Sequence, residues 1–226
     1  MSISTIPSHT SKKDERTIMP DSSRIPHQAD HPIRPPQPRG QVYSRADAIV
    51  GQTFSMRVID PVADLDLFHG WMNQPRVDIH WDLAGSREDH ADYLRRQAED
   101  PHIYGLISAF DGEDTGYFEA YWAKEDRLGP YYDAEDYDRG WHGLIGNPKM
   151  LGRHRTLCAF RSISHYLFLD EPRTRRIVGE PNAAHPHMIR YGEMVGYRKV
   201  KEFDFPHKRA ALLICEREEF FRHAGF

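Results

Sequence analysis

The residues best suited to chemistry lie in one stretch, residues 140–170 of this 226-residue chain. An apolar run at 141–145 predicts a strand, and apolar residues spaced by three or four predict a helix that ends near residue 170. The turn between them contains Gly152 and two arginines, Arg153 and Arg155. A helix N-terminus offers unbonded N–H groups and a positive dipole end, and arginine adds charge-assisted hydrogen bonds. The pattern indicates a phosphate or pyrophosphate site, although a plain helix start with surface arginines has the same pattern.

Composition argues against several other classes of protein. A net charge of −4 and a pI near 6.4 are not typical of a nucleic-acid binder, which usually has a basic face. No apolar run approaches the roughly 20 residues of a membrane helix, and the N-terminus lacks the apolar core of a signal peptide. Cys158 and Cys215 form no CxxC pair, so we expect no disulfide scaffold and a cytoplasmic protein. The fourteen histidines form no HExxH motif or Cys/His cluster, so no metal site is predicted.

The chain divides into two parts by composition. Residues 1–46 are rich in Ser, Pro, His and Arg and show no apolar periodicity, so they are expected to be a disordered extension. This extension is either a docking arm or a passive tail. Residues 47–226 are expected to form one folded domain, because 39% of the chain is hydrophobic and can supply a core.

The expected elements form a mixed α/β sheet with helices on both faces. The first strand is expected at 52–60, and helices at 64–73 and 87–100, the second with Ser86 as N-cap and Asp89 in a capping box. The apolar segment between these helices is expected to be a loop that covers a pocket or packs on the core. The remaining expected elements, besides those of residues 140–170, are a hairpin of strands at 103–110 and 115–123 that turns at Asp111-Gly112, an acidic loop at 124–139, a strand at 176–180, a helix at 186–195, and a closing hairpin at 198–205 and 210–216.

Alternation along the strand at 115–123 places Glu119 and Tyr121 on one face and Trp122 on the other. Glu119 and Tyr121 either bind a cationic substrate or line its pocket, or they form a solvated strand face. Trp81 in the apolar loop and Trp122 either wall the acceptor pocket or pack in the core. Acidic side chains of the long loop either steer a cationic substrate or are simply solvated: Asp126, Asp133, Glu135, Asp136 and Asp138.

The order of elements resembles the GCN5-related N-acetyltransferase fold, GNAT for short. Five segments resemble one branch of it, the siderophore-biosynthesis acyltransferases, which include the aerobactin, rhizobactin, alcaligin and mycobactin acyltransferases. The resemblance covers about residues 52–220. The five segments are WMNQPRV at 71–77, FEAYW at 118–122, DRGWHGLIG at 138–146, GEPN at 179–182 and MIRYGEMVGY at 188–197.

This resemblance implies transfer of an acyl group from coenzyme A, or in some members from a carrier protein, to an N-hydroxylated amine. The product is a hydroxamate, which later chelates ferric iron. The implied donor is acetyl-CoA, succinyl-CoA or a longer acyl-CoA. The implied acceptor is N-hydroxyputrescine, N-hydroxycadaverine, or an amino acid of hydroxylysine or hydroxyornithine type, and a siderophore synthetase is the implied pathway partner. Two alternatives stay open: an acetyltransferase of another small amine such as an aminoglycoside, and a catalytically silent acyl-CoA-binding protein.

The resemblance also assigns roles to residues. His142, which by spacing alone is more typical of a core histidine, matches the active-site histidine and would accept the amine proton. Asn182 stands where the family usually has Asp; an amide takes no proton, so Asn182 would only orient the acceptor. His185 stands where the family tends to have Asn. The matches to the coenzyme-binding strand and pyrophosphate turn are Leu144, Ile145, Met150, Leu151, Gly152, Arg153, His154 and Arg155.

Overall fold

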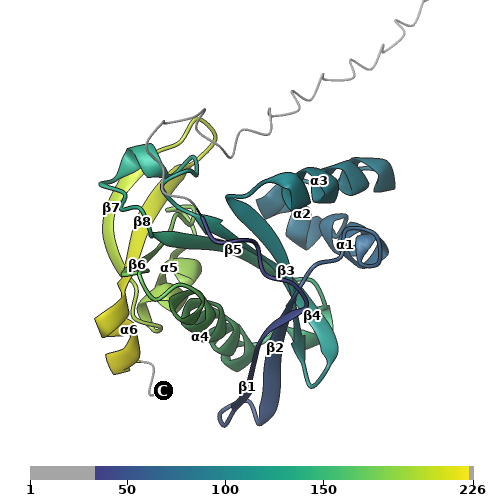
Figure 1. The fold of residues 1–226 in the computed structure, drawn as a ribbon, viewed down its shortest axis with the longest axis horizontal. Helices are drawn as coiled ribbons and strands as arrows, with labels where there is room; N and C mark the ends of the chain where they lie inside the picture. The colour runs from purple at the N-terminus through teal and green to yellow at the C-terminus, as the bar shows by residue number, and fades with distance from the viewer. Residues whose placement is uncertain (1–33, 224–226) are drawn as a thin grey trace, which may run out of the picture.

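One eight-stranded sheet organises the chain in this computed structural model, which describes residues 34–223. The strand order is β1-β2-β3-β4-β5-β6-β8-β7, and β5 and β6 are its parallel pair (Figure 1). Of the extension expected at 1–46, residues 1–33 lie outside the described residues. The strands are β1 (Gln41–Asp47), β2 (Gln52–Val58), β3 (Ile103–Phe110), β4 (Glu113–Trp122), β5 (Arg139–Ile145), β6 (Arg176–Gly179), β7 (Arg198–Asp204) and β8 (Arg209–Glu216).

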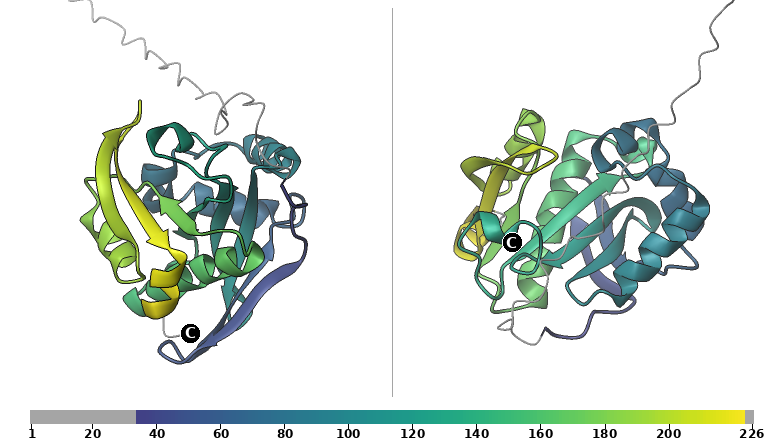
Figure 2. Two further views of the ribbon diagram at one scale, coloured as in Figure 1. Left: turned by 60° about the vertical axis from the view of Figure 1, so that its left-hand side comes forward. Right: turned by 90° about the horizontal axis from the view of Figure 1, so that it is seen from above.

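Helices cover both faces of the sheet, as the views in Figure 2 also show. Against one face pack α1 (Leu65–Met72), α2 (Pro75–Trp81) and α3 (Arg87–Glu99), where Phe68, Leu94 and Tyr117 belong to one buried cluster. Against the other pack α4 (Arg153–Asp170) and α5 (Pro186–Glu193), where Phe118 and Ile163 share a second cluster. A short helix, α6 (Arg217–His223), follows β8. The expected mixed α/β sheet with helices on both faces is therefore confirmed.

Local signals in the sequence located most elements to within a few residues. Ser86 caps α3 and forms the predicted capping box with Asp89. Asp111 and Gly112 both have positive φ, 49° and 84°, and turn the hairpin of β3 and β4. The closing hairpin of β7 and β8 is antiparallel as predicted.

Two expectations about local structure were wrong, and one helix was missed. Strand β1 lies inside the stretch expected to be disordered; it pairs antiparallel with β2, and buried Tyr43 packs into the core beneath α4. The apolar segment expected to be a loop forms α2, because Pro75 at its first position presets the helical φ. The helix α6 was not predicted.

The acidic loop was also misjudged, because two of its carboxylates are buried rather than solvated or free to steer a substrate. Asp138 accepts hydrogen bonds from Arg176 and from the Tyr132 hydroxyl. Asp126 accepts from the Leu128 N–H, and its Oδ2 lies 3.5 Å from Nε2 of buried His102. These contacts fold the loop back onto the edge of the sheet.

The parallel strands β5 and β6 stay paired over a very short length. Their register contains only Arg139 with Ile177 and Gly140 with Val178. Beyond Gly140, β5 continues for five residues that remain paired with β4 alone. The two strands therefore diverge and leave an opening between them. From residue 141 onward, the side of β5 that faces this opening has no β6 partner.

Candidate active site

His142 lies on β5 at the start of this opening, between two glutamates. Its Nδ1 is 3.1 Å from Oε2 of Glu119, and its Nε2 is 3.0 Å from Oε1 of Glu180. Glu119 is the register partner of His142 on β4, and Glu180 follows directly after β6. The imidazole thus joins the two strands on either side of the opening. About a quarter of its side chain, 24%, stays exposed, whereas both glutamates are buried.

Glu119 is held by the helices above the sheet. Its Oε1 accepts a hydrogen bond from the Tyr93 hydroxyl of α3 and another, 2.9 Å long, from Nε2 of Gln97. The Tyr117 hydroxyl lies 3.1 Å from the same oxygen. The alternative expected for Glu119, a solvated strand face, is wrong, because the side chain is buried. It is a buried carboxylate whose free oxygen is directed at His142.

Glu180 is held by a hydroxyl and by two cations. The Tyr121 hydroxyl donates to its Oε2 over 3.0 Å. Nη2 of Arg127 and Nζ of Lys208 lie 3.8 and 3.7 Å from its Oε1. Tyr121 reaches this position because its ring covers Gly140, where a Cβ atom would come within 2.2 Å of the ring. Sequence reasoning included Glu180 in the GEPN motif but assigned the role of orienting the acceptor to Asn182.

The two carboxylates control the charge of His142. Burial opposes the charged imidazole, but the attraction of Glu180 and hydrogen bonds with both glutamates outweigh it and raise the pKa of His142 to about 9. Burial alone would raise the pKa of Glu119 and of Glu180, yet the charge and hydrogen bonds of His142 lower both. Near pH 7 the arrangement is an imidazolium between two carboxylates, not the neutral base expected from sequence.

Aromatic side chains close in around His142. The ring of Tyr121 lies 4.8 Å from the imidazole, and the ring of Trp81 on α2 meets it edge-on at 6.4 Å. Trp81 and Tyr121 are therefore brought to the candidate site. Trp122 is not: it points to the other face of β4, where its ring lies under the guanidinium groups of Arg34 and Arg139. The alternative expected for Trp122, packing in the core, fits this position, because the side chain is buried.

The predicted anion turn is present at the N-terminus of α4. Gly152 precedes the helix with φ of 155°, a conformation that glycine adopts readily, and no side chain caps the helix. The first-turn N–H groups of Arg153, His154 and Arg155 thus lack a capping acceptor. Arg153 is exposed, whereas Nε of Arg155 donates to Gln52 over 3.0 Å. Met150 is buried and Leu151 is 51% exposed.

Leu144 and Ile145, both expected to bind the coenzyme, direct their backbone groups to opposite sides of β5. The Ala123 N–H donates to the Asp138 carbonyl, so these two residues form a hydrogen-bonded pair that continues the ladder of β4 and β5. Such pairs recur at every second residue of an antiparallel ladder, and Leu144 lies six residues after Asp138. The backbone of Leu144 therefore faces β4, and the backbone groups of Gly143 and Ile145 face the opening. The carbonyl of Ile145 already accepts from Arg76 of α2 over 2.7 Å.

Asn182 has a local role. Its Oδ1 accepts the Ala184 N–H over 2.9 Å, and its backbone forms an isolated bridge with Ala210. His185 precedes α5, and its ring meets that of His80 on α2 edge-on at 5.0 Å. Sequence reasoning assigned no role to Glu180, Arg76, Arg127 or Lys208. The GEPN motif contains Glu180 and the WMNQPRV segment contains Arg76, so a signal was present for two of the four.

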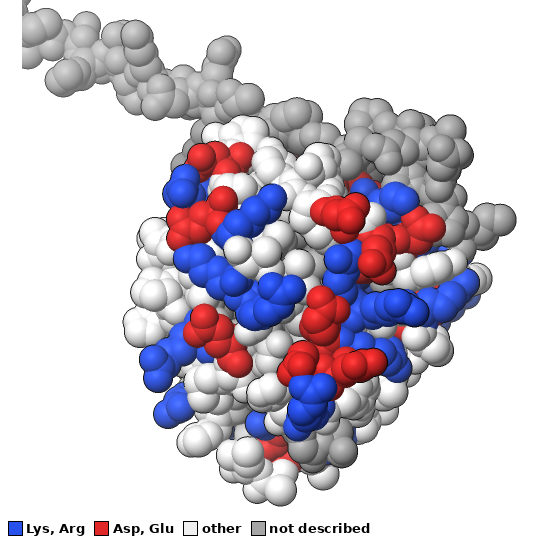
Figure 3. All heavy atoms as spheres, turned by 90° about the vertical axis from the view of Figure 1, so that its left-hand side faces the viewer, with Lys and Arg blue, Asp and Glu red and all other residues white. Residues whose placement is uncertain are grey.

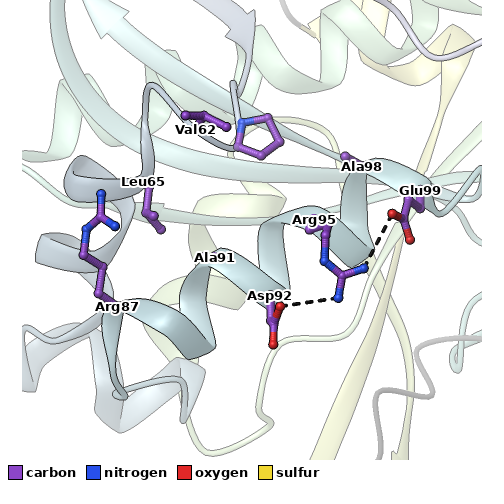
Figure 4. Close-up of a pocket in the computed structure, with 9 residues that line it drawn as sticks. Val62, Leu65, Arg87, Ala91, Asp92, Arg95, Ala98 and Glu99 are labelled. Atoms are coloured by element: carbon purple, nitrogen blue, oxygen red, sulfur yellow. Dashed lines mark hydrogen bonds and ion pairs between the residues drawn. The ribbon is translucent and has the colours of Figure 1, made fainter.

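Two cavities lie away from His142. One, of about 430 Å³, lies between α1 and α3, where Arg95 bridges Asp92 and Glu99 (Figure 4). The other, of about 1110 Å³, is lined by the acidic loop and the start of α6. Acidic and basic side chains mix on the face of β7, β8 and α6 (Figure 3). Within residues 34–223, no three His, Cys, Asp or Glu side chains are grouped to hold a metal ion.

Among the described helices, none is long and apolar enough to cross a membrane. Residues 60–205 match the family model described as an acetyltransferase (GNAT) domain. A crystal structure of a protein from Bacillus halodurans is similar, with a TM-score of 0.78 and 30% identity over 83% of this chain and 96% of that one. An aminoglycoside acetyltransferase solved with coenzyme A and kanamycin is similar in fold, with a TM-score of 0.68, 22% identity, and 76% and 99% coverage.

Two curated relatives are similar in sequence. An N(6)-hydroxylysine O-acetyltransferase of Escherichia coli is 43% identical over 86% of this chain. An N(5)-hydroxyornithine:cis-anhydromevalonyl coenzyme A-N(5)-transacylase of Beauveria bassiana is 47% identical over 86% of this chain. The matches span 62% and 44% of those two proteins' own lengths, so this chain corresponds to about half of each.

Proposed function

The chain belongs to the GNAT acetyltransferase family, and we propose that it transfers an acyl group from acyl-CoA to the nitrogen of an N-hydroxylated amine. The product would be a hydroxamate for siderophore biosynthesis. The observation that carries this proposal is the contact of both ring nitrogens of His142 with buried carboxylates, those of Glu119 and Glu180, at the opening of the sheet. The names of the relatives from Escherichia coli and Beauveria bassiana support an N-hydroxylated acceptor.

The acyl-CoA would bind along the opening. Its pyrophosphate would take the uncapped first turn of α4, with Arg153 free to add a charge-assisted hydrogen bond. Its pantetheine arm would run beside β5 and hydrogen-bond to the backbone of Gly143 and the Ile145 N–H. This course brings the thioester to His142, two residues before Leu144 on the same face of β5.

Because His142 would be charged near pH 7, it would first donate a proton and then accept one. The hydroxylamine nitrogen, which is neutral near pH 7, forms a bond to the thioester carbon while the C=O electron pair moves to oxygen. The electron pair on that oxygen then re-forms the C=O bond as the C–S bond breaks. The C–S electron pair leaves with sulfur, and the His142 imidazolium donates a proton to that thiolate. The neutral imidazole then accepts the proton that the acylated nitrogen loses. Holding both reactants in the opening supplies much of the remaining rate.

An acylation assay tests the function directly. The purified protein is incubated with acetyl-CoA or succinyl-CoA and with N(6)-hydroxylysine, N(5)-hydroxyornithine or N-hydroxycadaverine, each beside its non-hydroxylated parent. Mass spectrometry identifies the product, and ferric binding separates an N-acyl hydroxamate from an O-acyl ester, because only the hydroxamate chelates iron. We expect hydroxamates from the hydroxylated acceptors.

Two outcomes would contradict the proposal. Equal rates on the parent amines would instead favour a general small-amine acetyltransferase, the class to which the aminoglycoside enzyme of similar fold belongs. Tight acyl-CoA binding without transfer to any amine would indicate a silent binding protein.

A further inference from the structure

We propose that Arg127 and Lys208 bind a carboxylate of the acceptor, so that the acceptor is an N-hydroxylated amino acid and not an N-hydroxylated diamine. This inference rests on the proposed function and specifies its substrate class. Arg127 comes from the acidic loop and Lys208 from the turn between β7 and β8, so two separate segments bring a cation to the same place.

Both cations occupy fixed positions beside Glu180. Arg127 Nη2 and Lys208 Nζ lie 3.8 and 3.7 Å from the same oxygen, Oε1. Each also lies 5.6 Å from the centroid of the buried Phe205 ring. Cations over an aromatic face are held electrostatically and lose little mobility when a ligand binds.

The hydrogen-bonding capacity of the two cations is not used by Glu180. At 3.7 and 3.8 Å, both contacts are longer than a hydrogen bond. Among the described residues, the buried Nε atom of Arg127 has no hydrogen-bond partner. Glu180 already accepts from Tyr121 and contacts His142, so its oxygens are occupied. A second carboxylate would give Arg127 and Lys208 the charge-assisted bonds that they lack.

The two cations are also open to a ligand. The Arg127 side chain is 39% exposed and the Lys208 side chain is 20% exposed. With His142 charged, three positive groups surround the single negative charge of Glu180. An ammonium group, the only ionic group on an N-hydroxylated diamine, would be repelled by Arg127 and Lys208, whereas a carboxylate would be attracted.

The separation of these cations from His142 suits an amino acid. Both cations lie within 3.8 Å of Oε1 of Glu180, and the same oxygen lies 3.0 Å from Nε2 of His142, so one glutamate oxygen separates the cations from the imidazole. In hydroxyornithine or hydroxylysine, three or four methylene groups separate the α-carbon from the reactive nitrogen. Such a substrate can place its carboxylate at Arg127 and Lys208 and its nitrogen at His142.

The test compares acceptors that differ only in the carboxylate, with acetyl-CoA as donor. The wild-type protein is assayed with N(6)-hydroxylysine, with its carboxamide, and with N-hydroxycadaverine. We expect kcat/KM for the free acid to exceed the other two at least tenfold, mainly through KM. Equal values for the three acceptors would overturn the inference without any variant, and would leave the proposed function intact. No acylation of any acceptor would overturn the proposed function itself.

Variants then locate the effect. Arg127→Gln and Lys208→Gln should reduce the preference for the free acid about tenfold each, while Lys208→Arg should keep it. The readout is the ratio of kcat/KM for the free acid to kcat/KM for the other acceptors. This ratio cancels any effect of the lost cation on Glu180 and His142. Arg209→Gln is the matched control on the same hairpin, since Arg209 pairs with Glu202 and Asp204. Equal losses on all acceptors would show that the two cations only neutralise Glu180.

Discussion

Nε2 of His142 lies 3.0 Å from Oε1 of Glu180, and this contact crosses the opening between the diverging strands β5 and β6. Glu119 holds the other ring nitrogen from within the sheet. A substrate that enters the opening must therefore meet an imidazole whose two nitrogens are already engaged. We infer that the reacting groups displace or share the Glu180 contact while Glu119 keeps the ring oriented, as a carboxylate does for a catalytic histidine in other enzymes.

Replacing His142 by Gln should abolish most turnover and leave coenzyme binding almost unchanged. Proton transfer by a positioned side chain contributes roughly 10²–10⁴-fold, and glutamine cannot transfer a proton. The coenzyme pyrophosphate would bind at the α4 N-terminus, which does not include His142. Steady-state kinetics should show the fall in kcat, and calorimetric titration with coenzyme A should show a Kd within a few-fold of wild type. An undiminished kcat would remove His142 from the mechanism.

The pH profile of kcat distinguishes an acid from a base at His142. With a pKa raised to about 9, an imidazolium that acts first as an acid gives a rate that is level from pH 7 to 8 and falls above 9. A histidine that acts first as a base gives a rate that rises tenfold per pH unit up to about 9. Glu180→Gln should move the alkaline limb to lower pH, since it removes a charge that raises the pKa of His142. A limb that does not move would assign it to another group.

Arg153→Ala should weaken coenzyme A binding about tenfold, the worth of one hydrogen bond to a charged group. Within the described part of the chain, its guanidinium contacts Sδ of Met194 weakly, at 3.9 Å. Its removal should therefore leave the melting temperature near that of wild type. Arg198→Ala on the outer strand β7 is the control for a lost surface charge. The same Kd for Arg153→Ala and wild type would mean that the turn before α4 is only structural.

Asn182→Ala should retain most of its activity, in contrast to His142→Gln. Its side-chain oxygen is engaged by the Ala184 N–H, so the expected cost is stability, about 0.5–1.5 kcal/mol for one hydrogen bond. Urea unfolding measures that cost, and kcat should stay within a few-fold. A loss of 100-fold or more in kcat would return Asn182 to the catalytic role suggested by its position in the family motif.

Signals that are local in sequence predicted the fold well. The capping box at Ser86, the turn at Asp111-Gly112 and the periodicity of α4 each act within a few residues, and all three were confirmed. Strand β1 was missed because its pairing with β2 outweighs the polar composition around it. Helix α2 was missed because Pro75, a helix-starting residue at the first position, was taken as the start of a loop.

The candidate site was only half predictable from sequence. His142, Glu119 and Tyr121 are on adjacent strands, so alternation places them on one face. Glu180, Arg127 and Lys208 reach the site from three distant segments, and nothing in their local sequence records that they converge. The charge of His142 depends on this convergence. Sequence reasoning therefore pointed to His142, whose catalytic role stays a prediction, but could not give its charge.

The buried ion cluster around His102 should make the protein less stable as pH rises from about 6.5 to about 9. Burial opposes the charge on His102, but its hydrogen bond with Asp100 and the attraction of Asp100 and Asp126 outweigh it and raise its pKa to about 9. Between the unfolded pKa near 6.5 and the folded value, the native state holds more protons than the unfolded chain, so stability falls with pH. The stabilisation is complete below about 6.5 and lost above about 9, and it is on the order of a few kcal/mol.

Urea unfolding of wild type and His102→Gln at intervals from pH 6 to 9 measures this contribution. The variant should be less stable at pH 6, because Asp126 stays buried beside an uncharged residue, and its stability should fall less steeply with pH. His142 and the buried thiols of Cys158 and Cys215 also favour the protonated native state at alkaline pH. They are common to both proteins, so the difference between the two curves isolates His102. Parallel curves would show that His102 carries no charge in the native protein.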